Sequence, residues 1–106
     1  MKKHPKDVLN DALRVYRDPD ELAAFLAIAG HRGRRDKARE CPVARWLQGE
    51  CCKRGERVRV DSVSILLTTS KHTDILACLA TPSLIRDFVA RFDGGDYPEL
   101  CVETVK

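Results

Sequence analysis

The spacing of apolar residues changes from helical to alternating near the middle of this chain, and that change limits the folds open to it. Up to about residue 54 apolar side chains recur at helical spacing, as in Val43, Trp46 and Leu47. From residue 57 they alternate with charged ones, in Arg-Val-Arg-Val. Such alternation is typical of a strand with one buried face. We therefore expect an α+β fold, with three N-terminal helices, a small antiparallel sheet of two to three strands, and a C-terminal amphipathic helix packed on it.

Local start and stop signals place the three helices that precede the change of spacing. Asp18 followed by Pro19 is a helix cap followed by a favoured first helical residue. Gly30 and Gly55 are expected to end the second and third helices. The three helices are expected at residues 7–17, 19–29 and 42–54.

The alternating part of the chain predicts a hairpin, with strands at 57–60 and 63–68 joined through Asp61 and Ser62. Residues 75–80 read Ile-Leu-Ala-Cys-Leu-Ala and are apolar on both faces. A strand of that kind is typical of the middle of a sheet, so we expect a central third strand.

The strongest amphipathic stripe follows Thr81-Pro82-Ser83, which has the pattern of a cap and a proline at a helix start. Gly94 and Gly95 are expected to end this helix, and Tyr97 and Leu100 are expected to pack back against the core. The apolar face of the helix is expected to consist of Leu84, Ile85, Phe88, Val89 and Phe92.

Length and composition predict one domain, residues 1–106, with residues 1–6 and 103–106 frayed and residues 31–40 forming a basic loop. No apolar run approaches the roughly 20 residues that span a bilayer. The basic start lacks the apolar stretch of a signal peptide, so we expect a cytoplasmic protein without membrane contact. The five cysteines are an odd number, which in such a chain favours free thiols.

Positive charge is concentrated in the middle third of the chain. Residues 31–59 hold ten basic and four acidic residues, although the net charge of the whole chain is only +3. Such a concentration favours contact with an acidic partner surface or with phosphate groups. The candidate contact residues are Arg32, Arg34, Arg35, Lys37, Arg39, Arg45, Lys53 and Arg54.

Nucleic-acid binding is one reading of that charge. Guanidinium groups pair with phosphates, and three helices followed by a hairpin have the element order of a winged helix-turn-helix. The loop at 31–39 and the helix at 42–54 would then contact nucleic acid. Two observations oppose this reading: the loop is longer than a compact helix-turn-helix allows, and the overall charge is low for a nucleic-acid-binding domain.

The residues that commonly ligate metals do not have the spacing of a zinc site. Among His31, Cys41, Cys51 and Cys52 the only close pair consists of adjacent residues. We therefore expect partly buried thiols here, with no metal and no cofactor.

One set of residues resembles a nucleophile with a base: His72, Asp74 and Cys78. On a single strand the two ends of this set would lie about 20 Å apart, too far for a Cys–His hydrogen bond. We therefore expect His72 in a turn, Cys78 in the core, and no catalytic residue.

Two segments resemble known sequences: CPVARWL, residues 41–47, and IRDFVARFDGGDYPEL, residues 85–100. Together they are similar to small uncharacterised proteins of high-GC actinobacteria and of the phages that infect them. The resemblance implies a cytoplasmic accessory protein of host or phage. It carries over no activity and no site residue.

The absence of a catalytic set, the small size and the uneven charge favour a non-enzymatic binding or regulatory protein that acts through a protein partner. The last helix or the basic loop is expected to form the contact surface. A nucleic-acid-binding regulator is the alternative, and a homodimer formed through an exposed hairpin edge stays open.

Overall fold

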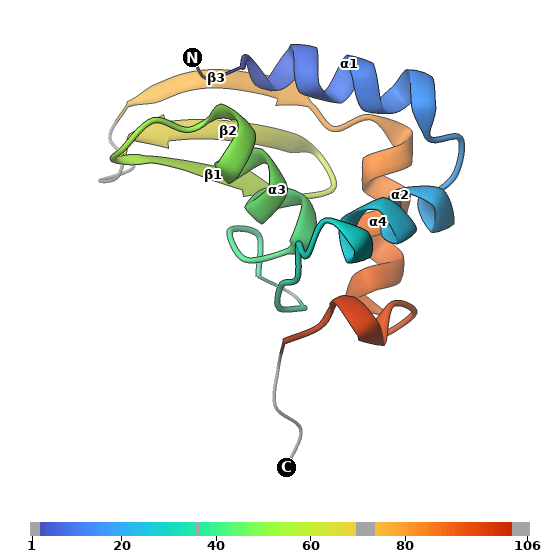
Figure 1. The fold of residues 1–106 in the computed structure, drawn as a ribbon. Coiled ribbons are helices and arrows are strands. Elements are labelled where there is room, and N and C mark those ends of the chain that lie inside the picture. The colour runs from blue at the N-terminus through green and yellow to red at the C-terminus, as the bar shows by residue number, and fades with distance from the viewer. Residues whose placement is uncertain (1–2, 36, 70–73, 103–106) are drawn as a thin grey trace.

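The computed structural model describes residues 3–35, 37–69 and 74–102, and in them the expected α+β fold is confirmed (Figure 1). The elements are α1 (Pro5–Val15), α2 (Pro19–Ile28), α3 (Pro42–Cys51), β1 (Glu56–Val60), β2 (Ser64–Thr69), β3 (Ile75–Ala80), α4 (Ser83–Asp93) and a short 3-10 helix, η1 (Pro98–Leu100). Of the residues expected to fray, 1–2 and 103–106 lie outside the described residues, whereas Pro5 and Lys6 belong to α1. No helix in the described ranges is long and apolar enough to cross a membrane.

The three strands form an antiparallel sheet in the order β1-β2-β3, so β2 is the central strand. Ile65 on β2 pairs with Val60 on one side and with Leu79 on the other. The prediction that residues 75–80 form a central strand is therefore wrong. β3 lies at an edge, and Ile75 on it is 65% exposed. Its inner side chains pack partly against the core, while its other apolar side chains are left to solvent.

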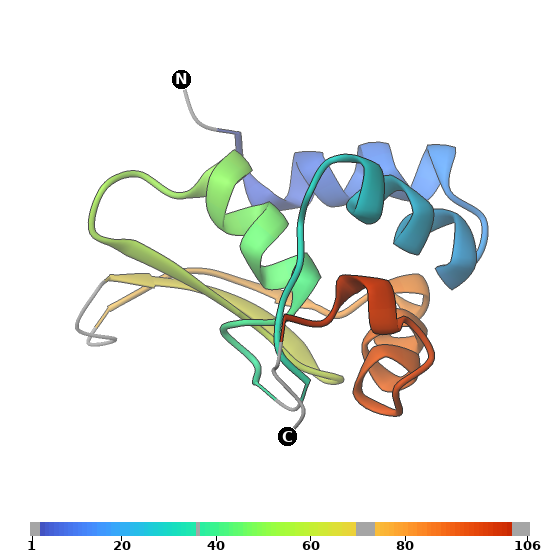
Figure 2. The same cartoon turned by 60° about the horizontal axis from the view of Figure 1, so that its bottom comes forward.

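Helices cover only one face of the sheet (Figure 2). α3 packs against β1, α1 packs against α3, and α2 packs against α4 and η1. On the uncovered side, which we term the open face, Arg59, Leu66 and Cys78 lie side by side across the three strands. Cys78 is exposed there, so its predicted place in the core is wrong. The covered face carries the buried strand residues Val58, Val60, Ile65 and Leu67.

At α1, α2 and α3 a side chain that precedes the helix accepts a hydrogen bond from an N–H group of the first turn. Asp18 Oδ1 accepts a hydrogen bond from the Glu21 N–H at 2.9 Å, which confirms the predicted start of α2. α4 begins differently from the prediction. Its first residue is Ser83, and the Thr81 hydroxyl donates to the Asp61 carbonyl oxygen at 2.7 Å instead of capping the helix.

α3 ends at Cys51, three residues before the predicted end at residue 54. The Lys53 N–H donates to Glu56 Oε1 at 2.7 Å, and the Glu56 N–H donates to the Lys53 carbonyl oxygen at 3.0 Å. Gly55 adopts a φ of +86° in this turn, a conformation that favours glycine. The turn directs the chain into β1 and takes Lys53 and Arg54 out of the helix.

The segment after α4 packs back on the helices, as predicted. Tyr97 and Leu100 are both buried. The Tyr97 ring stacks on Phe88 with centroids 5.2 Å apart, and its hydroxyl donates to Asp20 Oδ1 at 2.8 Å. These contacts fix α4 against the start of α2.

Candidate functional site

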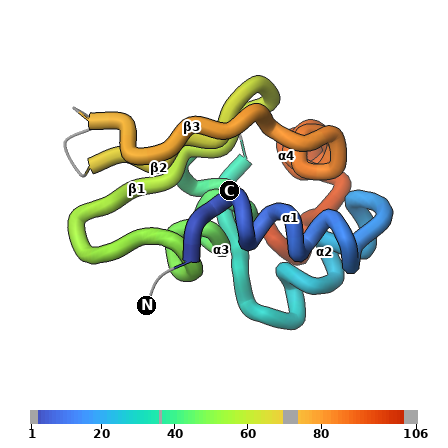
Figure 3. The backbone as a smooth tube through the Cα atoms, turned by 90° about the horizontal axis from the view of Figure 1, so that it is seen from above, coloured from blue at the N-terminus to red at the C-terminus, as the bar shows by residue number. Residues whose placement is uncertain are grey.

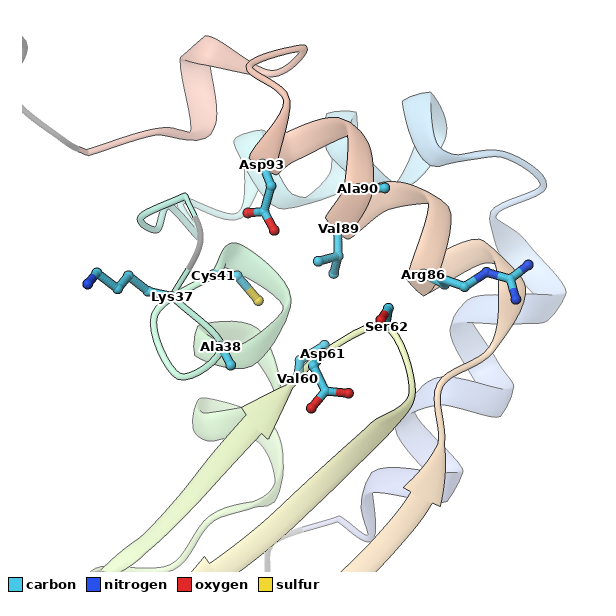
Figure 4. A pocket seen from close by; sticks show the side chains of 10 residues that line it. All are labelled: Lys37, Ala38, Cys41, Val60, Asp61, Ser62, Arg86, Val89, Ala90 and Asp93. Carbon is cyan, nitrogen blue, oxygen red and sulfur yellow. The ribbon is translucent and has the colours of Figure 1, made fainter.

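A groove of about 340 Å³ lies between residues 37–41, the turn after β1, and α4 (Figure 4). Two cations, Lys37 and Arg86, and two carboxylates, Asp61 and Asp93, line it. Figure 4 shows the Lys37 and Arg86 side chains extending outward at opposite ends of the groove. The groove thus has an apolar interior with charge of both signs around it. Its lining residues are Lys37, Ala38, Cys41, Val60, Asp61, Ser62, Arg86, Val89, Ala90 and Asp93.

Backbone hydrogen bonds hold residues 37–41 in place beside the sheet. The Val60 N–H donates to the Ala38 carbonyl oxygen at 2.8 Å, which attaches this segment to the edge of β1. The Arg34 N–H donates to the Glu40 carbonyl oxygen at 2.8 Å, so the basic loop folds back on itself. One wall of the groove is therefore a hydrogen-bonded loop anchored to a strand.

Gly33 joins this loop to the C-terminal segment. Its N–H donates to the Leu100 carbonyl oxygen at 2.8 Å, and its carbonyl oxygen accepts from the Val102 N–H at 2.9 Å. A Cβ at Gly33 would overlap the Glu40 carbonyl oxygen and would lie 2.6 Å from the Cys41 carbonyl carbon. Only glycine at position 33 lets the backbone of residues 40–41 approach so closely.

Cys41 lies at the base of the groove and is 2% exposed. Its Sγ accepts a hydrogen bond from the Ala44 N–H at 3.3 Å and so caps α3. Burial raises the pKa of the Cys41 thiol to about 11, and the negative charge of Asp93 acts in the same direction. The thiol is therefore protonated at neutral pH, which makes it a poor nucleophile.

Asp61, in the turn after β1, is held in its ionised form. Its Oδ1 accepts hydrogen bonds from the Ser64 and Val63 N–H groups, both at 2.8 Å. These bonds lower the pKa of the Asp61 carboxyl, and Arg59, whose Nε lies 3.8 Å from Oδ2, contributes to the same shift. The groove therefore keeps a fixed negative charge beside the hairpin turn.

A second recess, of about 370 Å³, adjoins the groove and shares Lys37 and Ala38 with it. It is also lined by Arg39, Glu40 and Arg59, so three cations lie around one carboxylate, although Asp61, 3.8 Å from Arg59, neutralises part of the Arg59 charge. We term Lys37, Arg39 and Arg59 the cationic recess. An anionic group lying across it would meet positive charge from both the loop and β1.

Only some of the predicted contact residues belong to this surface. Arg34 and Arg45 both form ion pairs with Glu40, at 3.8 and 3.7 Å, so part of their charge is neutralised within the protein. Arg35 lies at the end of α4, where a Cβ added to Gly95 would be 3.2 Å from its Nη1. Arg32 is exposed.

Lys53 and Arg54 do not join the other predicted residues. They follow the C-terminal end of α3, whereas residues 37–41 precede its N-terminal end, and the ten-residue helix separates them by about 15 Å. Arg59 contributes a cation that the prediction missed. The alternation of Arg59 with valines indicated that its side chain points outward. No local signal in the sequence indicated that the basic loop would pack beside β1.

Cys41, Asp61 and Asp93 line the groove, but they are not arranged to hold a metal ion. Within the described residues, no three side chains of His, Cys, Asp or Glu are placed to hold a metal ion. His31 lies with its ring 6.5 Å from that of Phe25 and lines neither recess. Of the set His72, Asp74 and Cys78, His72 lies outside the described residues.

No protein-family model, curated protein or solved structure matches this chain. The functional argument therefore rests on the residues and the geometry described above.

Proposed function

We propose that this chain is a non-enzymatic binding module that holds a short segment of a protein partner in the groove. The observation that carries the proposal is the position of the groove, whose apolar interior adjoins the cationic recess. An apolar side chain in the groove would be removed from water, while carboxylates of the same segment would face Lys37, Arg39 and Arg59. The expected partner segment has an apolar residue next to one or more acidic residues.

The chemistry of the groove supports binding rather than catalysis. Its sulfur nucleophile, Cys41, is buried and protonated, and the described residues that line the groove include no histidine. The carboxylates Asp61 and Asp93 line the groove together with Lys37 and Arg86, as in a surface that recognises a peptide of mixed charge. The two surfaces expected to contact a partner, α4 and the basic loop, form opposite walls of the groove.

Nucleic-acid binding has weaker support from the same geometry. A recognition helix has to present a polar face to the DNA groove, whereas α3 buries six of its ten residues against the core. Glu40 pairs with Arg34 and Arg45, and the carboxylates of the groove would repel phosphates. The mixed charge therefore favours a protein partner over a polyphosphate backbone.

The proposed cellular role is that of a cytoplasmic accessory protein. Its support is the resemblance of residues 41–47 and 85–100 to proteins of actinobacteria and their phages. Both segments line the groove, the first through Cys41 and the second through residues of α4.

Selection of a random peptide library on the full chain tests the proposal. We expect the selected peptides to share an apolar residue beside Asp or Glu. Ala90→Arg should fill the groove and abolish their binding, and reversing the charges of the cationic recess to Glu should weaken it at least about tenfold. Selected peptides without a shared pattern, or equal binding to Ala90→Arg, would contradict the proposal.

Matched control variants separate a local effect from a general one. Ala27→Arg makes the same change at an exposed position of α2, and Lys53→Glu with Arg54→Glu reverses charges at the far end of α3. Both controls should bind the selected peptides as the wild type does.

Fluorescence anisotropy with duplex DNA at about 50 and 200 mM salt tests the alternative. DNA binding that weakens steeply with salt, is lost on charge reversal and survives Ala90→Arg would favour nucleic acid over a protein partner.

A further inference from the structure

The two edges of the sheet differ in how their backbone groups are satisfied. At the β1 edge, Gln48 Nε2 donates to the Glu56 carbonyl oxygen at 2.6 Å, and Gln48 Oε1 accepts from the Val58 N–H at 3.0 Å. The Val60 N–H donates to Ala38. A side chain of α3 and the basic loop thus occupy the edge of β1 that faces away from β2.

The outer edge of β3 has no such cover. The backbone N–H and carbonyl groups of Val58 face away from β2. Val58 pairs with Leu67 and Leu67 pairs with Ala77, so the same groups of Leu67 face β3 and those of Ala77 face β2. The next peptide group, at Cys78, therefore faces away from the sheet. In the described part of the chain β3 pairs with β2 alone, and Figure 3 shows it as the outermost strand.

β3 also lacks the residues that usually protect a sheet edge. Natural edge strands carry Lys, Pro or inward-pointing charges that discourage pairing with another chain. β3 has none of these, although one third of the residues in the chain are charged. Its Ile75 and Leu76 are 65% and 48% exposed. The register irregularity between Leu67 and Thr68 affects only the start of β3, and residues 77–80 pair regularly with β2.

We propose that this edge pairs antiparallel with β3 of a second copy of the chain, which joins two three-stranded sheets into one. Two identical strands without charge do not repel each other, and both can present free backbone groups. In the described part of each copy only the β3 edge is uncovered, because Gln48 and the basic loop occupy the β1 edge, so the assembly closes at two copies about a two-fold axis. The partner is thus another copy of this chain, on a surface separate from the groove.

The two-fold arrangement makes a specific prediction about Cys78. Its peptide group faces outward near the middle of β3, so the register centred on it pairs Cys78 with Cys78 of the second copy. Directly opposed residues in a hydrogen-bonded antiparallel pair have Cα atoms about 5.5 Å apart. That separation falls within the range of about 4.4–6.8 Å that a disulfide spans. Both thiols are free and lie on the open face.

Sedimentation of the full chain at about 1 to 200 µM tests the assembly. We expect the wild type to reach twice the chain mass of 12.0 kDa. Cys78→Pro removes the outward N–H without removing a bond to β2, and Cys78→Lys places two like charges at the centre of the pair. Both variants should stay at the mass of one chain while unfolding cooperatively. A wild type that is monomeric throughout this range would overturn the proposal.

Two controls locate the contact. Cys78→Ser keeps the backbone and should still dimerise. Ile28→Lys changes an apolar residue that is 89% exposed on α2 and should have no effect. If Ile28→Lys dissociates the dimer and Cys78→Lys does not, the α2 surface is the interface and the proposal is wrong.

Oxidation with diamide then tests the register. The wild type should form a disulfide-linked dimer, seen on a non-reducing gel, and Cys78→Ser should not. A dimer cross-linked through Cys101 instead would contradict the proposed pairing.

Discussion

Tyr97 donates its hydroxyl to Asp20 across 77 positions of the chain, with Oη 2.8 Å from Oδ1. Arg91 Nη1 lies 3.5 Å from the same oxygen, and Phe88 stacks on the Tyr97 ring. This contact therefore joins α2, α4 and the segment before η1. Because α4 forms one wall of the groove, the hydrogen bond between Tyr97 and Asp20 helps to hold that wall in position.

The Tyr97 hydroxyl should make the stability of the protein decrease at alkaline pH. Burial raises the pKa of Tyr97 to about 12, and the bond to Asp20 acts in the same direction. A phenol in the unfolded chain titrates near pH 10. The stability contributed by the protonated phenol is therefore complete below about pH 10 and is lost as the pH rises toward 12.

Tyr97→Phe should remove that part of the pH dependence. At pH 7 it should lower the free energy of unfolding by about 0.5–1.5 kcal/mol, the net value of one hydrogen bond. Urea unfolding of both proteins between pH 7 and 12 measures both effects, with Tyr16→Phe as the control. An equally steep alkaline decline in Tyr97→Phe would mean that another group causes it.

Two glycines should respond to alanine in opposite ways. Gly33→Ala places a Cβ against the Glu40–Cys41 backbone and should lower the free energy of unfolding by about 1–3 kcal/mol or more. Gly49→Ala adds a Cβ inside α3 that meets no atom within 4 Å apart from its chain neighbours and the backbone of its own helix, and should raise the free energy of unfolding by about 0.5–1 kcal/mol. Urea unfolding of the pair measures the difference. Equal effects at the two positions would contradict the close backbone contact at Gly33.

Gln48 should protect the protein from assembly through β1. Gln48→Ala leaves the Glu56 carbonyl and the Val58 N–H without their partner, and should lower the free energy of unfolding by about 1–3 kcal/mol. Because a second edge then becomes free, light scattering should show species larger than a dimer at high concentration. Gln48→Glu keeps the acceptor for Val58 and should give an intermediate result. A Gln48→Ala protein as stable and as small as the wild type would mean that the edge needs no cover.

Cys41 should resist alkylation in the native state. Its thiol is buried and protonated, so iodoacetamide at pH 8 should modify Cys41 only as fast as the protein unfolds. In dilute protein the exposed Cys78 should react first. Mass spectrometry of peptides taken over time distinguishes the sites. Modification of Cys41 at the rate of Cys78 would show that the groove opens to solvent far more than its geometry indicates.

Local signals were enough to predict that the four helices exist, although not the end of α3 or the first residue of α4. Asp18 and Pro19 mark a helix start through the chemistry of the first turn, which depends on adjacent residues only. The position of β3 depended on more than its own residues. An apolar run indicates a strand, but whether a further strand lies beyond it is decided elsewhere in the chain.

Only part of the candidate site was predicted, because the site also depends on contacts between distant parts of the chain. Lys37 and Arg39 were found because they lie in a dense run of positive charge. Arg59 joins them only because Val60 bonds to Ala38, a contact between distant parts of the chain. Charge counted along the sequence also included Lys53, which the length of α3 places at the far end of the helix.

The bonds of Gly33 to Leu100 and Val102 have a consequence for how the protein is made. Ribosomes add about 5–20 residues per second, so Leu100 is synthesised roughly 3 to 13 seconds after Gly33. Throughout that interval the basic loop lacks its hydrogen bonds to residues 100 and 102. For most of the interval α4 has not yet been synthesised. The groove therefore takes its final shape late in synthesis, and a nascent chain lacks the finished surface that the proposed partner would bind.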